Sequence, residues 1–232
     1  MSKTSATVHL TKRAAAQRQL NAAIRMLLGN EDELAVHTVA AAAFHILKDI
    51  KKMERGRSEL ADSLNRGLFY TARNFATGKK LPDFLDETLT RAVHKTADAI
   101  KRGEINSKAD VTYFKVHASA ESSYWRKFNL AANFLKHADW DVKDTLELRQ
   151  LENEKLIMAA SASYCELMNE PTPEIVAFAA FVLDDEELIR FLPEGTAKKL
   201  RGSKPAARRR LCLKLSRDLT KALARTRERA TL

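Results

Sequence analysis

Apolar side chains between residues 30 and 55 recur at alternating intervals of three and four, and this spacing constrains the fold more than any other feature. Val36, Val39, Ala43 and Ile46 carry the pattern. Residues at these intervals share one face of an α-helix, whereas a half-buried strand would alternate by two. The stretch is therefore predicted to be a long helix with one buried face.

The same pattern recurs along the chain, and capping or breaking residues separate the segments. Glycine and proline are scarce, at seven and five residues, which favours helices. Helices are expected over about residues 11–28, 30–54, 58–76, 82–102, 107–138, 152–168 and 172–192. This order predicts an all-α fold, a single helical bundle of about seven helices plus a basic C-terminal amphipathic helix. We expect a bundle domain over residues 1–192, a linker over 193–205 and the basic helix over 206–232.

Bulk composition excludes several classes of protein. Hydrophobic residues make up 45% of the chain, which is enough for a globular core. No apolar run approaches the ~18 residues that a membrane span needs, and residues 1–13 lack the apolar core of a secretory signal. Cys165 and Cys212 are too isolated for a disulfide framework or a metal site. We therefore expect a cytoplasmic protein with reduced thiols and no cofactor.

The positive charge of the chain is concentrated at its C-terminal end. Residues 198–232 contain thirteen Lys or Arg against Asp218 and Glu228, whereas residues 1–197 contain 27 basic and 28 acidic residues. The net charge of +10 therefore comes from the basic segment and not from the body. This asymmetry indicates a polyanionic partner.

Within the basic segment, Leu211, Leu215, Leu219 and Leu223 form an apolar stripe on the expected helix. Three interpretations stay open: nucleic acid (RNA or DNA) bound through its phosphates, an anionic membrane or acidic protein, or a helix docked on the body with solvated charges. The stripe lacks Trp and Phe, which counts against the membrane. The candidate nucleic-acid-binding residues are Lys204, Arg208, Arg209, Arg210, Lys214, Arg217, Lys221 and Arg225.

A second feature is the segment NFLKHAD, residues 133–139, near the end of the fifth expected helix. Asn133 and His137 are four residues apart and therefore share a helix face. Together with Arg126 they form a polar line beside the expected core stripe around Trp125. A half-buried Asn and His need hydrogen-bond partners, which a cleft or a subunit contact would supply. The alternative is a purely structural role for both side chains.

This Asn-x-x-x-His pair, on a long helix of an all-α protein, resembles the active-site helix of the HEPN superfamily. The chain also resembles an uncharacterised bacterial helical family that carries a His-Thr-x-Ala-Ala-Ala segment, which begins here at His37, and an Asn-Phe-x-Lys-His-Ala-Asp segment. Many HEPN proteins are ribonucleases with an Arg, a following polar residue and a His. The resemblance implies metal-independent RNA cleavage, in which Arg stabilises the phosphorane and His acts in acid–base catalysis.

The chain departs from this pattern because Ala132 stands where the superfamily has Arg. The nearest Arg on the same face, Arg126, lies roughly 16 Å along the helix from His137. A partner subunit, Lys127, Lys136 or the basic tail would have to supply the cation.

Three functions are therefore considered. The first is a non-catalytic HEPN-like protein that binds nucleic acid through its C-terminal helix. The second is a ribonuclease with Asn133 and His137 as catalytic residues, and the third is an adaptor that binds only protein. A homo-oligomer formed through the long helices is expected in each case.

Two further pairs have the spacing of metal ligands on one helix face, Glu33 with His37 and His45 with Asp49. The sequence has no His-Glu-x-x-His and no repeated Glu-x-x-His motif of a di-iron protein. Pairs of this kind usually support an exposed helix face. No metal site is expected.

Overall fold

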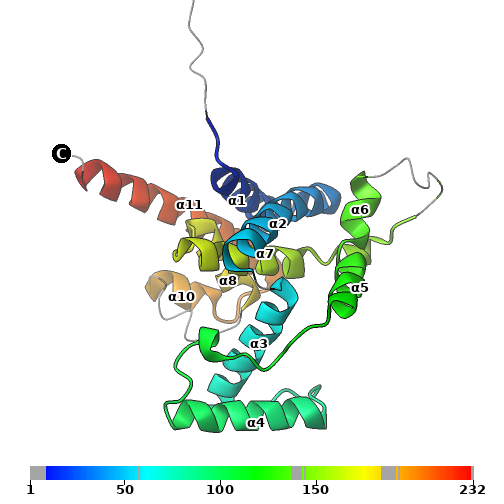
Figure 1. Ribbon diagram of the computed structural model, residues 1–232. Coiled ribbons are helices and arrows are strands. Elements are labelled where there is room, and N and C mark those ends of the chain that lie inside the picture. The colour runs from blue at the N-terminus through cyan, green and yellow to red at the C-terminus, as the bar shows by residue number, and fades with distance from the viewer. Residues whose placement is uncertain are drawn as a thin grey trace, which may run out of the picture. The chain divides into compact units, whose positions relative to one another are not determined.

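The computed structural model describes residues 9–56, 58–136, 143, 145–183, 192 and 194–230. These residues form ten α-helices and two short 3-10 helices, and no strand occurs among them (Figure 1). The predicted all-α class is therefore confirmed. Within the same ranges, no helix is both long and apolar enough to cross a lipid bilayer.

The helix bounds follow the capping residues of the sequence. Thr11, Ser58 and Thr172 accept backbone N–H groups at the starts of the first, third and eighth helices, which satisfies donors that a helix leaves unpaired. The α-helices are α1 (Lys12–Gly29), α2 (Glu33–Arg55), α3 (Glu59–Ala76), α4 (Glu87–Lys101), α5 (Ala118–Phe128), α6 (Leu130–Lys136), α7 (Asn153–Met168), α8 (Pro173–Val182), α10 (Glu194–Leu200) and α11 (Pro205–Ala230). The 3-10 helices are η1 (Lys108–Asp110) and η2 (Leu148–Leu151).

The chain divides into two compact units. Unit 1 combines residues 1–50 with residues 129–232, and in it α1 packs against α7, α8 and α11. Leu20 and Ile24 of α1 and Phe178 of α8 are fully or almost fully buried in this unit. The basic helix α11 therefore belongs to the same unit as the first helix of the chain.

Helix α8 is fixed at its N-terminal end by α1. The Arg25 guanidinium donates to Glu174 at 2.6 Å, and the Thr172 hydroxyl donates to Asn21 Oδ1 at 2.8 Å. Glu174 is buried in the first turn of α8, where a carboxylate suits the positive end of the helix dipole. These contacts fix the position of the helix that later receives α11.

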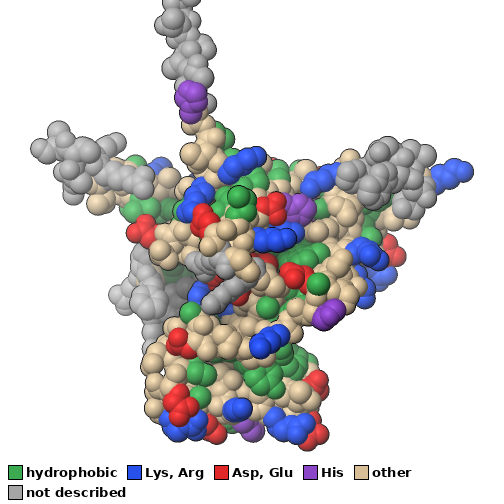
Figure 2. Space-filling model, viewed as in Figure 1, with side chains coloured by type: hydrophobic (Ala, Val, Ile, Leu, Met, Phe, Trp, Pro, Cys, Tyr) green, Lys and Arg blue, Asp and Glu red, His purple; other side chains and the backbone are tan. Residues whose placement is uncertain are grey.

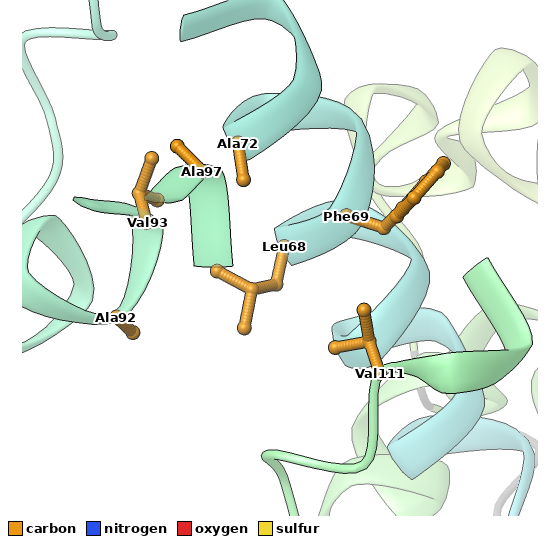
Figure 3. Close-up of a cluster of buried hydrophobic side chains, with 7 residues drawn as sticks. All are labelled: Leu68, Phe69, Ala72, Ala92, Val93, Ala97 and Val111. Atoms are coloured by element: carbon orange, nitrogen blue, oxygen red, sulfur yellow. The ribbon is translucent and has the colours of Figure 1, made fainter. Parts of the chain in front are cut away.

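Unit 2 comprises residues 51–128 and has its own small core. Helices α3 and α4 pack together, and η1 lies against α3. Figure 3 shows the side chains of both helices and of the segment after η1 converging on one cluster. The members of this cluster are Leu68, Phe69, Ala72, Ala92, Val93, Ala97 and Val111.

The structure corrects the prediction of one long helix over residues 107–138. The Ser107–Asp110 capping box is present but opens only η1, and residues 111–117 are not helical. Asn65 bonds both backbone groups of Phe114, because its Nδ2 donates to Phe114 O at 3.2 Å and its Oδ1 accepts Phe114 N–H at 2.9 Å. This segment is rich in β-branched and aromatic residues, which have low helix propensity. The helix resumes as α5 and is interrupted again at Asn129 before α6.

Other boundaries also differ from the prediction. Helix α2 begins at Glu33, three residues after the expected start at Asn30, because Asn30 has left-handed backbone (φ 58°) and ends α1. The fourth helix begins at Glu87 behind the N-cap Asp86, five residues after the expected start at Pro82. Residues 194–200 form the short helix α10 inside the segment expected to be a linker. The seventh helix, expected over 172–192, ends as α8 at Val182, because Leu183 has extended backbone (φ −95°, ψ 113°). Residues 184–191 lie outside the described residues.

Candidate functional site

Helix α11 is docked on the body by its N-terminal half. Cys212, Leu215 and Ser216 are buried, and the helix packs against α8 and α1. Leu219 is half-buried one turn further on, whereas Leu223 is 49% exposed. Figure 1 shows the last turns of α11 extending beyond the helices on which it packs. The apolar stripe predicted from the leucines is therefore the docked face only as far as about Leu219.

Arg208 is part of this docked face and caps α8. Its guanidinium donates to Ala180 O at 3.2 Å from Nε and 3.0 Å from Nη2, and to Leu183 O at 3.3 Å. The last carbonyls of an α-helix lack partners within the helix, and a cation there also suits the negative end of the dipole. Arg208 thus joins α11 to the C-terminal end of α8.

Arg209 also contacts the body. Its guanidinium lies 5.4 Å from the ring centroid of Phe181, which is a cation–π geometry. It also donates a hydrogen bond to the side-chain oxygen of Asn30, the residue that ends α1. Two of the eight residues predicted to bind nucleic acid, Arg208 and Arg209, therefore contact the body outside α11.

The buried thiol of Cys212 lies in the same contact. Burial raises the pKa of Cys212 to about 11, against a smaller lowering by Arg208. The thiol therefore stays protonated near neutral pH and behaves as a packing group.

Five of the remaining candidates lie on the opposite face of α11. With about 100° per residue, these five side chains fall within an arc of about 80° whose centre is about 180° from the docked face. All five are exposed, and they extend over about 22 Å of helix. We call this set the basic ridge, and its members are Arg210, Lys214, Arg217, Lys221 and Arg225.

One carboxylate modifies the ridge. Asp218 lies at its edge and accepts a hydrogen bond from Lys214 at 2.7 Å. This contact with Lys214 is the main cause of the lowered pKa of Asp218, so the carboxylate is ionised at neutral pH. Lys204, the last of the eight candidates, is exposed just before the first turn of α11 and lies off the ridge.

The motif residue Asn133 lies on α6 and is half-buried. Asn129 lies one turn before it on the same face, and its side-chain oxygen is 3.1 Å from Nε2 of His45 on α2. Lys136 Nζ lies 3.5 Å from Nδ1 of the same imidazole. We call His45, Asn129 and Lys136 the polar cluster, and Asn133 lies one turn after Asn129 on the same helix face. His137, the other half of the motif, lies outside the described residues.

The hydrogen bonds assign the protonation state of His45. Because an amide oxygen only accepts, Nε2 carries the proton, and Nδ1 accepts from the Lys136 ammonium. Burial lowers the pKa of His45, and the charges of Lys136 and Lys48 lower it further, while Asn129 and Asp49 act in the opposite direction. The imidazole is therefore neutral at pH 7.

The histidines of the two pairs with metal-ligand spacing form hydrogen bonds to asparagine side chains. His37 is buried and its Nδ1 lies 2.9 Å from Asn153 Oδ1, while Asn153 Nδ2 donates to Glu33 O, so this pair joins α2 to α7. His45 belongs to the polar cluster. Across the described part of the chain, no group of three or more His, Cys, Asp or Glu side chains is placed to hold a metal ion.

Sequence analysis considered His45 only as a metal ligand beside Asp49, and it did not identify Asn129 or the docked role of Arg208 as part of any site. Each acts through a partner far along the chain, such as Asn129 with His45 across 84 residues. Arg126, expected beside Asn133 on one continuous helix, is an exposed residue of α5 in unit 2. Comparison with protein-family models, with curated proteins and with solved structures finds no match to this chain.

Proposed function

We propose that this chain binds nucleic acid as a non-catalytic protein, through the basic ridge of α11. The observation that carries the proposal is the division of α11 into two faces. Its docked face contacts α8 and α1, and the ridge on the other face points to solvent. A polyanion can therefore reach all five cations without displacing the helix. Lys and Arg side chains arranged in this way neutralise phosphates and release counterions.

The distribution of charge on the rest of the chain supports this choice of surface. Residues 1–197 are close to neutral in balance, and Figure 2 shows acidic and basic side chains interspersed over the face that it draws. The excess of positive charge, and the field that it produces, therefore belongs to the C-terminal segment, in which the ridge presents five cations over about 22 Å of helix. Such a field attracts a polyanion and speeds its association.

A membrane surface fits α11 less well than nucleic acid does. Interfacial helices insert an apolar face that commonly includes Trp, Phe or Leu. Here the buried part of the leucine stripe, around Leu215, packs on the protein. Insertion of that stripe would require α11 to leave the body, with the loss of the Arg208 contacts to α8.

The test is nucleic-acid binding by two variants of equal charge. Lys214→Gln, Arg217→Gln and Lys221→Gln together remove the centre of the ridge. Arg91→Gln, Lys95→Gln and Lys101→Gln remove the same charge from exposed positions of α4. Fluorescence anisotropy with labelled DNA and RNA oligonucleotides should show that only the ridge variant loses binding. Equal loss in both variants, or undiminished binding by the ridge variant, would contradict the proposal.

A second candidate function is metal-independent RNA cleavage at Asn133 and His137. The position of Lys136 favours it, because this residue supplies a cation on α6 one turn after Ala132, the position at which the HEPN pattern has Arg. A labelled RNA incubated with the protein and a metal chelator tests it. Cleavage that is abolished by His137→Ala and by Asn133→Ala would support the candidate, and activity that survives either change would exclude that residue as catalytic.

A further inference from the structure

We infer that the basic ridge binds the phosphate backbone of double-stranded nucleic acid and does not read bases. This inference rests on the proposed function and deepens it by naming the form of the ligand. Three features of α11 carry it: the chemistry of the ridge, its geometry and the position of Asp218.

The chemistry of the ridge excludes the contacts on which single-strand binding depends. Proteins that hold single strands without sequence preference stack the bases on aromatic side chains, in addition to neutralising phosphates. Residues 198–232 contain no Phe, Tyr or Trp. The ridge also contains no Asn or Gln, which form the bidentate contacts that identify adenine. Its three arginines have the donors that bind guanine O6 and N7, and the comparison of two duplexes of unrelated sequence tests for that contact. What remains is a set of long cationic side chains suited to phosphates.

The geometry of the ridge favours a duplex because of charge density. A duplex carries one phosphate charge for about every 1.7 Å of its axis, so a length of about 22 Å carries roughly thirteen phosphates, of which those on the near side face the ridge. The docked half of α11 holds Arg210 and Lys214 in place, since Cys212 and Leu215 beside them are buried. A fixed row of cations binds most tightly to a ligand whose phosphates are also held in place, because no conformational entropy is then lost in ordering either partner.

Asp218 lowers the affinity of the ridge for phosphates. Its carboxylate is ionised and lies at the edge of the ridge beside Lys214. A phosphate that approaches Lys214 therefore meets a negative charge as well. Counting five cations and one carboxylate, we expect the ridge to release about four counterions.

The experiment measures binding of the full chain to labelled oligonucleotides of about 20 bp while salt is raised from about 50 to about 200 mM. The probes are a DNA duplex, an RNA duplex, a second DNA duplex of unrelated sequence and each component single strand. We expect a log–log salt slope of about −4 for the duplexes. Both kinds of duplex should bind at least tenfold more tightly than the single strands, and the duplexes should agree with one another within tenfold.

The outcomes separate this inference from the proposed function. A single strand that binds as well as the duplexes, or with less than a tenfold deficit, would overturn duplex recognition and leave nucleic-acid binding by the ridge intact. A difference of more than tenfold between the duplexes would overturn backbone-only contact. Failure of every probe to bind would overturn both.

Two variants should change the affinity for duplex in opposite directions. Asp218→Asn removes the carboxylate and should strengthen duplex binding about threefold at low salt. The ridge variant with Lys214, Arg217 and Lys221 changed to Gln should bind duplex at least about a hundredfold less tightly, with a salt slope nearer −1. If Asp218→Asn weakened binding, the carboxylate would instead be needed to position Lys214, and the charge count would be wrong.

Discussion

The protonation state of His45 depends on side chains of its own helix, α2, and of the segment that contains α6. It lies on α2 and meets Asn129 and Lys136 around α6, and burial is the largest cause of its lowered pKa. A neutral imidazole that donates through Nε2 and accepts through Nδ1 satisfies both neighbours at once. Protonation would place a second cation beside the Lys136 ammonium.

We therefore expect opposite effects of two substitutions on the pKa of His45. Lys136→Met removes a neighbouring positive charge and should raise the pKa, whereas Asn129→Ala removes the hydrogen bond that supports the charged form and should lower it. Titration of the imidazole by NMR measures both. Shifts of the same sign in the two variants would show that the cluster is not arranged as described.

The lowered pKa of His45 makes the free energy of unfolding depend on pH. Above about pH 6.5 the imidazole is neutral in the folded and unfolded chain alike. Below that value the unfolded chain takes up a proton that folded His45 resists, so the contribution of this residue to stability falls as pH drops and levels off below the folded pKa. Urea unfolding of His45→Gln should show a smaller loss between pH 7 and pH 5 than the unchanged chain.

At the scale of single helices, α11 combines a docked face and a basic ridge, and two neighbouring arginines separate these roles. Arg208 donates to the last carbonyls of α8, whereas Arg210 lies on the ridge. Arg208→Gln should lower the free energy of unfolding by about 2 kcal/mol, because charged hydrogen bonds to the last carbonyls of α8 are lost. Arg210→Gln should change it by less than about 0.5 kcal/mol.

Binding should show the reverse order. With nucleic acid as the probe, Arg210→Gln should weaken affinity at temperatures where both variants are folded, and Arg208→Gln should have the smaller effect. Thermal unfolding and anisotropy on the same samples measure the two quantities. If both arginines affected stability equally, the division of α11 into two faces would be incorrect.

The last part of α2 carries a buried lysine that contacts the start of α3. Lys51 is almost fully buried, and its ammonium lies 2.7 Å from Glu59 Oε2 and 3.2 Å from Asp62 Oδ2, both at the start of α3. Arg66 also contacts Glu59, at 3.6 Å. These charges join the helices on either side of the turn at Gly56, whose positive φ of 61° suits glycine.

Lys51→Met should therefore be strongly destabilising, by about 3 kcal/mol, because it leaves two carboxylates near the core with one cation fewer. Lys52→Met is the matched control, since Lys52 is exposed, and it should have almost no effect. Chemical denaturation compares the two. A small loss for Lys51→Met would mean that the carboxylates find water or Arg66 instead.

Local signals predicted the helices well where their boundaries are set by nearby residues. Ser58, Thr172 and the Ser107–Asp110 box are caps that act within four residues, and all three are present. The continuous helix over 107–138 was wrong because its interruption depends on Asn65, 49 residues before Phe114. The composition of residues 111–117 did carry a warning, since Val, Thr, Tyr and Phe disfavour helices.

The candidate sites, like the helices, could be predicted from the sequence only as far as they depend on nearby residues. The charge of the C-terminal segment could be read from composition, but its division into ridge and docked face depends on where α8 and α1 lie. Arg208 and Arg210 are equivalent in sequence and differ only in which side of α11 meets the body. His45 could not be assigned to the Asn133 motif, because the contact forms between residues 84 positions apart.

For the whole molecule, the docked α11 means that the basic segment is part of the folded body. Deletion of residues 205–232 would uncover the surface on which Cys212 and Leu215 pack and would remove the Arg208 cap from α8. We expect the melting temperature to fall by about 10 °C, or the truncated chain to aggregate. The ridge variant with three Gln residues should melt within about 2 °C of the unchanged chain.

The deletion and the Gln variant therefore test different properties of α11, its packing on the body and its charge. Loss of nucleic-acid binding after deletion would reflect damage to unit 1 as well as loss of charge. The Gln variant removes the charge and keeps the buried contacts of α11. A truncated chain that melted normally would contradict the docking of α11, and differential scanning fluorimetry with a light-scattering readout distinguishes the cases.

The spacing of the ridge has a consequence for the helix that carries it. Arg210 with Lys214, Arg217 with Lys221, and Lys221 with Arg225 are like charges four residues apart, and each such pair opposes helix formation by a few tenths of a kcal/mol. Residues 221–226 of α11 are exposed, so burial against the body does not offset this self-repulsion there. A bound polyanion removes the repulsion, so α11 should gain helicity at its free end as ligand is added. Far-ultraviolet circular dichroism would then register binding as folding of the last turns, most strongly at low salt.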